Sequence, residues 1–388
     1  MEWIEHGFSL LSKAVKNHLP KGAVNDLITE GIISGLGGIF VFIPQIAFLF
    51  AFIAILEDTG YMARVSFILD RIMRKFGLNG RSVIPLISGA ACAVPSVMST
   101  RTISNWKERI ITILVIPLIS CSARLPVYTL LIALVIPQKN LWGFINYQGL
   151  VLFSLYLIGF SAAIFSAYIF KMILKSKERS YFIMEMPIYR APRWGTVVLT
   201  MIEKVKVFLF DVGKVIISIS IILWVLSSYA PGDSFEKIEE KYAHFDNAEN
   251  IIAAEKLEAS YAGIFGKTIE PVIKPLGFDW KIGIALITSF AAREVFVGTM
   301  ATIYSVGTDD ESSLLQKMKQ DKNQNGDKIY TLATGVSLLL FYVFAMQCMS
   351  TIAVVYRETG HWKWPLFQFL YMGALAYFSS LIAYQLLA

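Results

Sequence analysis

The sequence predicts an all-α polytopic membrane protein that consists of two related halves. Of its 388 residues, 55% are apolar and only 16% are charged, and the mean hydropathy is +0.57. Soluble domains have about 45–50% apolar and about 25% charged residues, so these charges are too few to cover a soluble core. The 27 Phe, 17 Tyr and 8 Trp residues also exclude a disordered chain. A membrane, in which lipid replaces the polar surface, accounts for this composition.

Six apolar segments are long enough to cross the membrane, because about 20 helical residues span a hydrocarbon core of about 30 Å. They are 31–56, 110–136, 149–174, 211–229, 330–356 and 365–387. Two further apolar stretches, 82–100 and 282–304, contain small residues near their middle. Each of the two is either a full span or a hairpin that enters and leaves the membrane on the same side.

An internal repeat relates the two halves at an offset of 200 residues. Matching pairs run without a gap over about forty residues: Tyr61/Tyr261, Asp70/Glu270, Arg74/Lys274, Gly77/Gly277, Asn79/Asp279, Ile84/Ile284 and Ser99/Thr299. Further along, Cys121 and Cys348 match at an offset of 227. A polar insert at 307–328 accounts for most of that difference, so the chain is two copies of one design.

Charge predicts that the two copies have opposite orientations. The loop 57–81 carries five Lys or Arg against three Asp or Glu, whereas its counterpart 231–280 carries five Lys against ten Asp or Glu. Basic loops stay in the cytoplasm, so matching loops face opposite sides of the membrane. An inverted repeat is a common plan of transporters. It requires an odd number of crossings in each half.

A re-entrant hairpin at 82–100 leaves an odd number of crossings in the first half. It also keeps Arg101, Lys107 and Arg109 in the cytoplasm. Each half then has three spans, one re-entrant hairpin and one amphipathic interfacial helix such as 61–76, and both chain ends lie outside. The expected order is an amphipathic N-terminal segment 1–30, a first repeat 31–175, a basic cytoplasmic connector 176–210, and a second repeat 211–388 with polar external loops 231–280 and 307–328.

All three cysteines fall within apolar segments, so we expect free thiols at membrane depth and no disulfide framework. Cys92 lies at the tip of the first hairpin, where small residues let the backbone approach an ion and where Pro95 is expected to stop the helix. Cys121 lies between Pro117 and Pro126, which break an apolar helix and free its carbonyl groups. A broken span of this kind is typical of an ion site.

The second half carries Cys348 in the equivalent place, flanked by Met346, Gln347 and Met349. Thiols and thioethers are soft ligands, suited to a transition metal more than to sodium or calcium. Both are also ordinary core side chains, so a structural role stays open. The sequence predicts as metal ligands Cys92, Cys121, Cys348, Met346, Met349, Ser120 and Glu294.

Charged residues at the second hairpin tip and at the end of the first span are candidates for a gate or vestibule. Arg293 and Glu294 would lie at membrane depth, where ionisable groups are costly and mark function. They could instead pair with each other or with the backbone. Glu57 and Asp58 form either a vestibule or a helix end in water. The full set for the gate or vestibule is Glu57, Asp58, Arg124, Arg293, Pro95 and Pro126.

Several function classes are excluded. The four histidines lie outside the apolar segments, no GxxxxGK[ST] phosphate loop occurs, and no nucleophile–base pair has motif spacing. We therefore expect a transporter and not an enzyme, with no GTPase motif in this sequence. The net charge of +6 is spread between the apolar segments, which favours the lipid bilayer over nucleic acid as a partner.

Four stretches resemble the membrane domain of the bacterial ferrous iron transport protein B family: LEDTGYMARVSFILDRIMRKFGLNGRSVIPLISGAACAVPSVMSTRT (56–102), PLISCSARLPVY (117–128), LGFDWKIGIALITSFAAREVFVGTMATIY (276–304) and QCMSTIAVVYRETGHWKWP (347–365). That domain contains two Gate repeats, also described as nucleoside-recognition domains, and the resemblance covers nearly the whole chain. It implies multi-pass insertion in the bacterial cytoplasmic (inner) membrane and uptake of Fe²⁺ as cargo, with no stably bound cofactor. The family's cysteines fall on Cys92, Cys121 and Cys348, and its glutamate falls on Glu294.

The resemblance also bears on partners. Family members carry an N-terminal cytoplasmic G domain and one more span ahead of the region matched here, so the link to GTP hydrolysis is open. A separate cytoplasmic G protein, small iron-transport accessory proteins and a second copy of the chain are implied partners. Two alternatives remain: a Gate permease for a nucleoside-like substrate or another divalent metal, and a membrane partner that recruits a G protein through the basic segment 171–206. Hairpin tips with few amide side chains favour metal.

Overall fold

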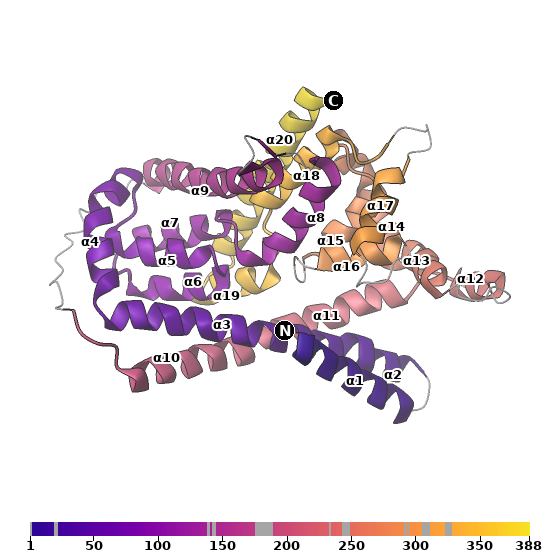
Figure 1. The fold of residues 1–388 in the computed structure, drawn as a ribbon, viewed down its shortest axis with the longest axis horizontal. Coiled ribbons are helices and arrows are strands. Elements are labelled where there is room, and N and C mark those ends of the chain that lie inside the picture. Colours follow the sequence, from indigo (N-terminus) through magenta and orange to yellow (C-terminus); the bar gives the residue numbers. More distant parts are fainter. Residues whose placement is uncertain are drawn as a thin grey trace. The chain divides into compact units, whose positions relative to one another are not determined.

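The computed structural model describes residues 2–18, 22–137, 140–141, 145–174, 189–232, 234–242, 249–290, 293, 295–304, 311–322 and 328–388. These residues form helices joined by short turns, together with one antiparallel pair of two-residue strands, β1 (Asn140–Leu141) and β2 (Ile145–Asn146), in which Leu141 pairs with Ile145. The helical fold predicted from the composition is confirmed (Figure 1).

The helices follow the two halves of the sequence. The first half contains α1 (Glu2–His18), α2 (Ala23–Asp26), α3 (Ser34–Asp58), α4 (Tyr61–Met73), α5 (Val83–Gly89), α6 (Ala93–Ser99), α7 (Trp106–Val115), α8 (Leu125–Val135) and α9 (Tyr147–Leu174). The second half contains α10 (Trp194–Val207), α11 (Gly213–Ser228), α12 (Ser234–Tyr242), α13 (Glu249–Ala259), α14 (Tyr261–Ile273), α15 (Trp280–Thr288), α16 (Val295–Ile303), α17 (Glu311–Gln320), α18 (Leu332–Phe344), α19 (Met349–Thr359) and α20 (Lys363–Leu387). Two π-helical turns, Leu27–Ile33 and Phe208–Val212, precede α3 and α11.

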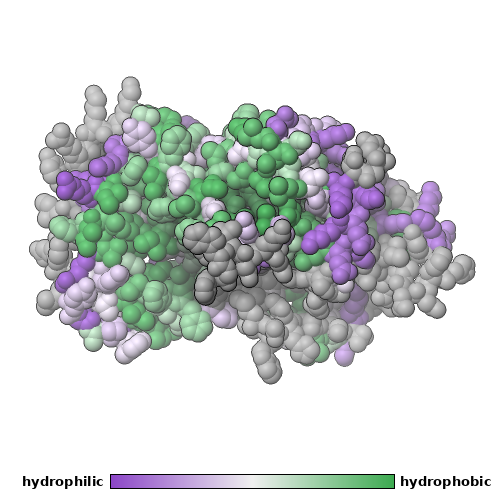
Figure 2. Space-filling view, turned by 45° about the horizontal axis from the view of Figure 1, so that its top comes forward, coloured by the Kyte–Doolittle hydropathy of each residue, from purple (hydrophilic) through white to green (hydrophobic). Residues whose placement is uncertain are grey.

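Within the described residues, five helical stretches are long and apolar enough to cross a membrane, in agreement with a polytopic membrane protein. They are Trp106–Val135, Tyr147–Leu174, Trp194–Ser228, Leu332–Thr359 and Lys363–Leu387. A sixth is reached if the end of α3 is counted together with α4, which turns away from it by 81°. Figure 2 shows a face on which apolar side chains gather, while hydrophilic residues lie in separate groups.

Two of these stretches are broken, and they are the buried ones. In Trp106–Val135 and Leu332–Thr359, 72% and 67% of the most apolar window is buried, against 28% for α9 and 22% for α20. An interrupted helix frees backbone N–H and C=O groups, which cannot face lipid. The continuous helices α9 and α20 therefore suit lipid contact, and their exposed side chains include Phe153, Phe165 and Phe378.

The helices divide into two compact units, each of which contains helices from both halves of the sequence. The first unit comprises Met1–Cys121, Ser161–Trp224 and Met349–Leu366, and the second comprises Ser122–Phe160, Val225–Cys348 and Phe367–Ala388. In the first unit α19, from the second half of the sequence, packs against α6. In the second unit α8, from the first half, packs against α16, α17 and α18. Each unit is thus completed by a helix from the other half of the chain.

The repeat seen in the sequence recurs in local structure. α4 and α14 begin at Tyr61 and Tyr261, and a single 3₁₀ turn follows each of them. Gly77 and Gly277 then take left-handed backbone angles, with φ of 82° and 80°. The next turn is capped by Asn79 in one half and by Asp279 in the other, whose side chains accept the amide hydrogens of Ser82 and Ile282. The opposite orientation of the two halves stays a prediction.

The two left-handed glycines differ in what lies beside them. A Cβ at Gly77 would overlap the aliphatic chain of Lys171, whose Nζ donates to the carbonyl oxygens of Arg74 and Lys75 at 3.0 Å. A Cβ at Gly277 would overlap the aromatic ring of Tyr384 on α20. The Lys171 atom nearest to Gly77 is its Cβ, which can move only with α9, whereas the overlapping Tyr384 atoms belong to the outer part of a half-buried ring, which can rotate away.

We expect Gly77→Ala to destabilise the protein more than Gly277→Ala does. Both substitutions place a side chain at positive φ, which costs about 1–2 kcal/mol. Overlap with the Lys171 Cβ adds about 1–2 kcal/mol at Gly77, because that atom moves only with α9. The thermal midpoint of the purified protein in detergent, followed by Trp fluorescence, measures the difference. Equal midpoints for the two variants would show that α9 does not hold Lys171 closely against Gly77.

A second prediction concerns Asp279, which lies at the N-terminus of α15 outside the membrane-length helices. Burial raises its pKa to about 6 from the usual 3.8, although the Ile282 amide donates to its Oδ1 at 2.9 Å. The native carboxyl group therefore holds a proton between about pH 4 and 6 when the unfolded one does not. Stability falls as the pH rises through that window and stays lower above it.

Asp279→Asn keeps the cap and removes the buried charge, so it should raise stability by about 1–3 kcal/mol at pH 7.5 and change little at pH 4. Thermal midpoints at the two pH values test this. Asn79→Asp is the matched reverse change in the first half. It should lower stability at pH 7.5, because the Asn79 Nδ2 that donates to Glu108 at 2.8 Å would be lost. A higher midpoint for Asp279→Asn at both pH values would rule out titration as the cause.

Candidate functional site

The first hairpin is a pair of helices too short to cross a membrane. α5 and α6 have seven residues each, and the chain reverses between them at residues 90–92. The amides of Ala91 and Cys92 both donate to the carbonyl oxygen of Ser88 at 3.0 Å, and the Ser96 hydroxyl donates to that of Pro85. These bonds satisfy backbone groups at the turn, as a re-entrant segment requires.

Pro95 does not act as the sequence suggested. It lies inside α6, as its third residue, and is buried. The expectation that Pro95 stops a helix is wrong, because a proline in the first turn of a helix loses no intrahelical hydrogen bond. The helix break falls earlier, at the turn before Cys92.

Within the first unit, α6 joins the elements that carry two of the predicted thiols. Cys92 immediately precedes α6, and α6 packs against the 3₁₀ turn Ile116–Leu118 as well as against α19. The chain leaves that turn in extended conformation at Ile119, passes the buried Ser120 and reaches Cys121. Cys92 and Cys121 are both half-buried, and neither forms a disulfide. The segments that carry Cys92 and Cys121 therefore both lie next to α6.

In the second unit Arg293 holds the break between α18 and α19. Its Nε donates to the carbonyl oxygen of Gln347 at 3.3 Å and its Nη2 to that of Ala345 at 3.4 Å. The Arg293 side chain is buried, as is Met346 inside the break, while Cys348 is half-buried. A guanidinium ion thus occupies part of the carbonyl surface that the break exposes.

The remaining predicted residues are scattered. Glu294 lies outside the described residues, together with 291–292. Arg124 is buried, whereas Met349, Glu57 and Pro126 are exposed. Pro126 lies in the first turn of α8.

Asp58 is the last residue of α3 and binds the segment that precedes α10. It accepts hydrogen bonds from the Arg193 amide at 2.6 Å and from Arg190 Nη2 at 3.1 Å. Arg190 Nε also donates to the Asp58 carbonyl oxygen at 3.1 Å. These contacts give Asp58 a structural role at the end of α3, where the chain returns before α10.

Among the described residues, no three His, Cys, Asp or Glu side chains gather closely enough to hold a metal ion. The proposed ligand set Cys92, Cys121, Cys348, Met346, Met349 and Ser120 therefore stays a prediction. The geometry does place its members at helix breaks or at the first residue after one. Such positions expose carbonyl oxygens and suit an ion that sheds its water step by step.

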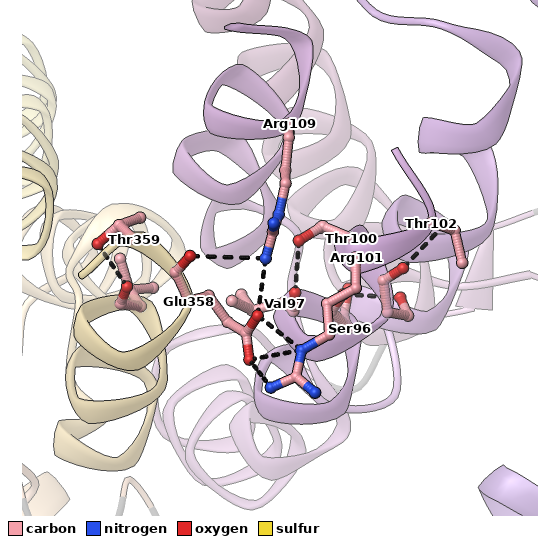
Figure 3. Close-up of polar contacts among 10 residues, drawn as sticks. Ser96, Val97, Thr100, Arg101, Thr102, Arg109, Glu358 and Thr359 are labelled. Carbon is pink, nitrogen blue, oxygen red and sulfur yellow. Dashed lines mark hydrogen bonds and ion pairs between the residues drawn. The ribbon is translucent and has the colours of Figure 1, made fainter. Parts of the chain in front are cut away.

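A buried ion-pair cluster in the first unit was not predicted. Arg101, which follows α6, donates to Glu358 from Nε at 2.9 and 3.1 Å and from Nη2 at 2.6 Å (Figure 3). Arg109 on α7 donates from Nη2 to the other oxygen at 2.8 Å. The Glu358 side chain is 2% exposed, against 19% for Arg109 and 53% for Arg101. The cluster fastens the end of α19 to α6 and α7.

Sequence patterns gave little warning of this cluster. Glu358 follows the last predicted residue of the 330–356 span and looks like an ordinary interfacial charge. The offset of 227 pairs it with Leu131, so the repeat offers no matching acid. The one usable signal was the unbalanced charge at 101–109, which holds three basic residues and a single acid.

Comparison with known proteins now identifies the family. A family model described as "Gate: Nucleoside recognition" matches residues 39–135 and 209–362, well over half of the chain. The chain belongs to the Gate family. Between those two matches, the model described as "Ferrous iron transport protein B C terminus" covers residues 152–204. This chain therefore has two Gate segments, as the resemblance implied, with the segment matched by the ferrous iron transport protein B model between them, and it is a multi-pass membrane protein.

Curated relatives match this chain along almost its whole length. The Fe(2+) transporter FeoB of Leptospira interrogans serovar copenhageni is 49% identical over 386 residues, 99% of this chain and 54% of that protein. The Fe(2+) transporter FeoB of Methanocaldococcus jannaschii is 38% identical over 98% of this chain and 52% of that protein. A fusion of Fe(2+) transport protein A with Fe(2+) transporter FeoB from Porphyromonas gingivalis is 39% identical over 100% of this chain and 47% of its own length.

This chain thus spans about half the length of the curated relatives that it matches. No solved structure matches it.

We expect Glu358→Gln to destabilise the protein by about 2–4 kcal/mol, because Arg109 is left partly buried without its counter-charge. The half-exposed Arg101 keeps the figure below that of a fully buried pair. The thermal midpoint in detergent measures the loss. Glu258→Gln is the matched control, since its partner Lys267 and Glu258 itself are 46% and 43% exposed. The control should change stability by less than about 0.5 kcal/mol, and equal effects of the two variants would contradict a special role for Glu358.

Proposed function

We propose that this chain is the ion-conducting membrane part of a ferrous iron transporter and carries Fe²⁺ across the bacterial cytoplasmic membrane. The observation that supports it best is the match of 98–99% of the chain to proteins named Fe(2+) transporter FeoB. The buried broken spans support it independently, because freed carbonyl groups inside a bundle are the usual place for an ion site. The longer relatives are named as Fe(2+) transporters, and Fe²⁺ transport by this chain is inferred from them.

The path we propose runs along the helix breaks. α6 and α19 pack together and their C-terminal ends meet at Glu358, which supports placing their N-terminal ends, with Cys92 and Met349, toward the same side. Cys121 follows a turn that also packs on α6. Thiolate, thioether and carbonyl groups there would replace the water shell of Fe²⁺, a borderline cation for which sulfur is a good ligand. Glu294 would offset charge at the second hairpin.

Two other functions are less well supported. A nucleoside-like substrate is suggested by the description of the Gate model, but the first hairpin tip offers small and apolar side chains with no amide group between Ser88 and Pro95. A membrane partner that recruits a separate G protein would use the basic segment 171–206, of which 175–188 lie outside the described residues. Transport assays distinguish all three.

Uptake of Fe²⁺ into proteoliposomes under reducing conditions tests the proposal. The double variant Cys92→Ser plus Cys121→Ser should lower the uptake rate at least about tenfold, a loss typical of disturbed metal ligation. Uptake should also fall at low pH, because thiols must lose their protons to bind metal. Ser166→Ala, a comparable change at a buried residue on α9, serves as the control and should keep the wild-type rate.

Wild-type uptake by the double variant would show that the thiol path is wrong while leaving transport intact. Absence of uptake by the unaltered chain, with or without an added G protein and GTP, would contradict the transport function itself. Competition by Mn²⁺ or Zn²⁺ would identify a broader metal permease. Competition by uridine would favour the nucleoside-like alternative.

A further inference from the structure

The backbone at the break between α18 and α19 is hydrogen-bonded to an arginine side chain. α18 ends at Phe344, and the next residue, Ala345, takes an extended conformation with φ of −64° and ψ of 140°. Arg293 from the second hairpin donates to the carbonyl oxygens of Ala345 and Gln347 at 3.4 and 3.3 Å. The backbone of this short segment therefore has polar partners although it lies away from solvent.

The Gln347 side chain does not share in this arrangement. It is 1% exposed, and neither its amide oxygen nor its amide nitrogen has a hydrogen-bond partner among the residues that the structure describes. The Tyr342 hydroxyl lies near it, but the two groups do not meet hydrogen-bond geometry. A buried amide with both ends unsatisfied costs free energy that an apolar side chain of similar size would save. Such a group calls for an explanation in its function.

The position of Gln347 in the repeat points to that function. The offset of 227 that relates Cys348 to Cys121 also relates Gln347 to Ser120. Both residues are buried, both immediately precede a cysteine, and both lie where a membrane-length helix is broken. Ser120 is among the oxygen ligands predicted from the sequence. In the second half Gln347 has a longer side chain than Ser120, and its amide oxygen is a stronger metal ligand than a hydroxyl oxygen.

We propose that the Gln347 amide oxygen is a ligand for the transported divalent cation, next to the Cys348 thiol. This inference rests on the proposed function. An amide oxygen is a neutral, hard donor, and a thiolate is a soft one, so the pair suits a borderline cation such as Fe²⁺ better than Na⁺ or Ca²⁺. Because Arg293 occupies the neighbouring carbonyl groups, the side chain of Gln347 supplies the oxygen that the backbone no longer can.

The experiment compares Gln347→Leu with the unaltered chain in two measurements. The first is the Fe²⁺ concentration for half-maximal uptake into proteoliposomes, and the second is the thermal midpoint in detergent without metal. If Gln347 is an unsatisfied amide kept for binding, the leucine variant should need about tenfold more Fe²⁺ and melt about 2–4 °C higher. A structural glutamine would give the opposite shift in the midpoint.

Gln368→Leu is the matched control, because Gln368 is a buried glutamine on α20 of the same unit. It should leave the half-maximal Fe²⁺ concentration unchanged. Gln347→Ser, which copies the first half, should give a smaller increase than Gln347→Leu because it keeps an oxygen. If the leucine variant does not fold, the serine variant decides, and an unchanged half-maximal concentration for it overturns the inference.

Several outcomes would overturn the proposal. They are an unchanged half-maximal concentration in Gln347→Leu, a lower midpoint in that variant, or an equal rise in half-maximal concentration in Gln368→Leu. In each of these cases the unaltered chain still transports Fe²⁺, so the proposed function stands. If the unaltered chain takes up no Fe²⁺, the proposed function fails and Gln347 loses its assigned substrate with it.

Discussion

The fold depends on one constraint: backbone N–H and C=O groups at membrane depth must be paired inside the protein. Broken helices violate this constraint unless other groups take over. At the first hairpin the Ser88 carbonyl oxygen accepts two amide hydrogens, and at the α18–α19 break Arg293 supplies the donors. The two broken spans are also the buried ones, whereas α9 and α20, which are continuous, face outward. Interruption and burial therefore occur together, and they create the surfaces that an ion can use.

The Glu358 cluster shows how the exchanged helix α19 is kept in place. Burying a carboxylate is expensive, and an ion pair of this kind stabilises a fold less than well-packed apolar residues would. The cluster instead specifies how α19 packs, because the Arg101 and Arg109 donors meet Glu358 only when the end of α19 lies against the ends of α6 and α7 (Figure 3). The cluster thus fixes the register of the helix that begins directly after Cys348.

Much of the fold followed from the sequence, because span length, small-residue breaks and the 200-residue offset are local signals. The hairpin at α5–α6 and the break after Pro117 lie where the residues indicated. Pro95 misled, because a proline at the start of a helix and one at its end look alike in a sequence. Glu358 escaped notice, and Gln347 was noted only as a neighbour of Cys348, for another reason. Their character comes from burial among residues far away in the chain, which periodicity does not report.

The two halves differ in side-chain polarity at several matched positions. Relative to the first half, the second replaces a small or apolar residue by a polar or charged one in three matched pairs: Ala93/Arg293, Ser120/Gln347 and Leu131/Glu358. Each break nevertheless has a buried arginine beside it, Arg124 in the first and Arg293 in the second. A cation at either break would therefore meet a neighbouring positive charge. The buried side chains of Ser120 and Gln347 distinguish the two breaks more than this charge does.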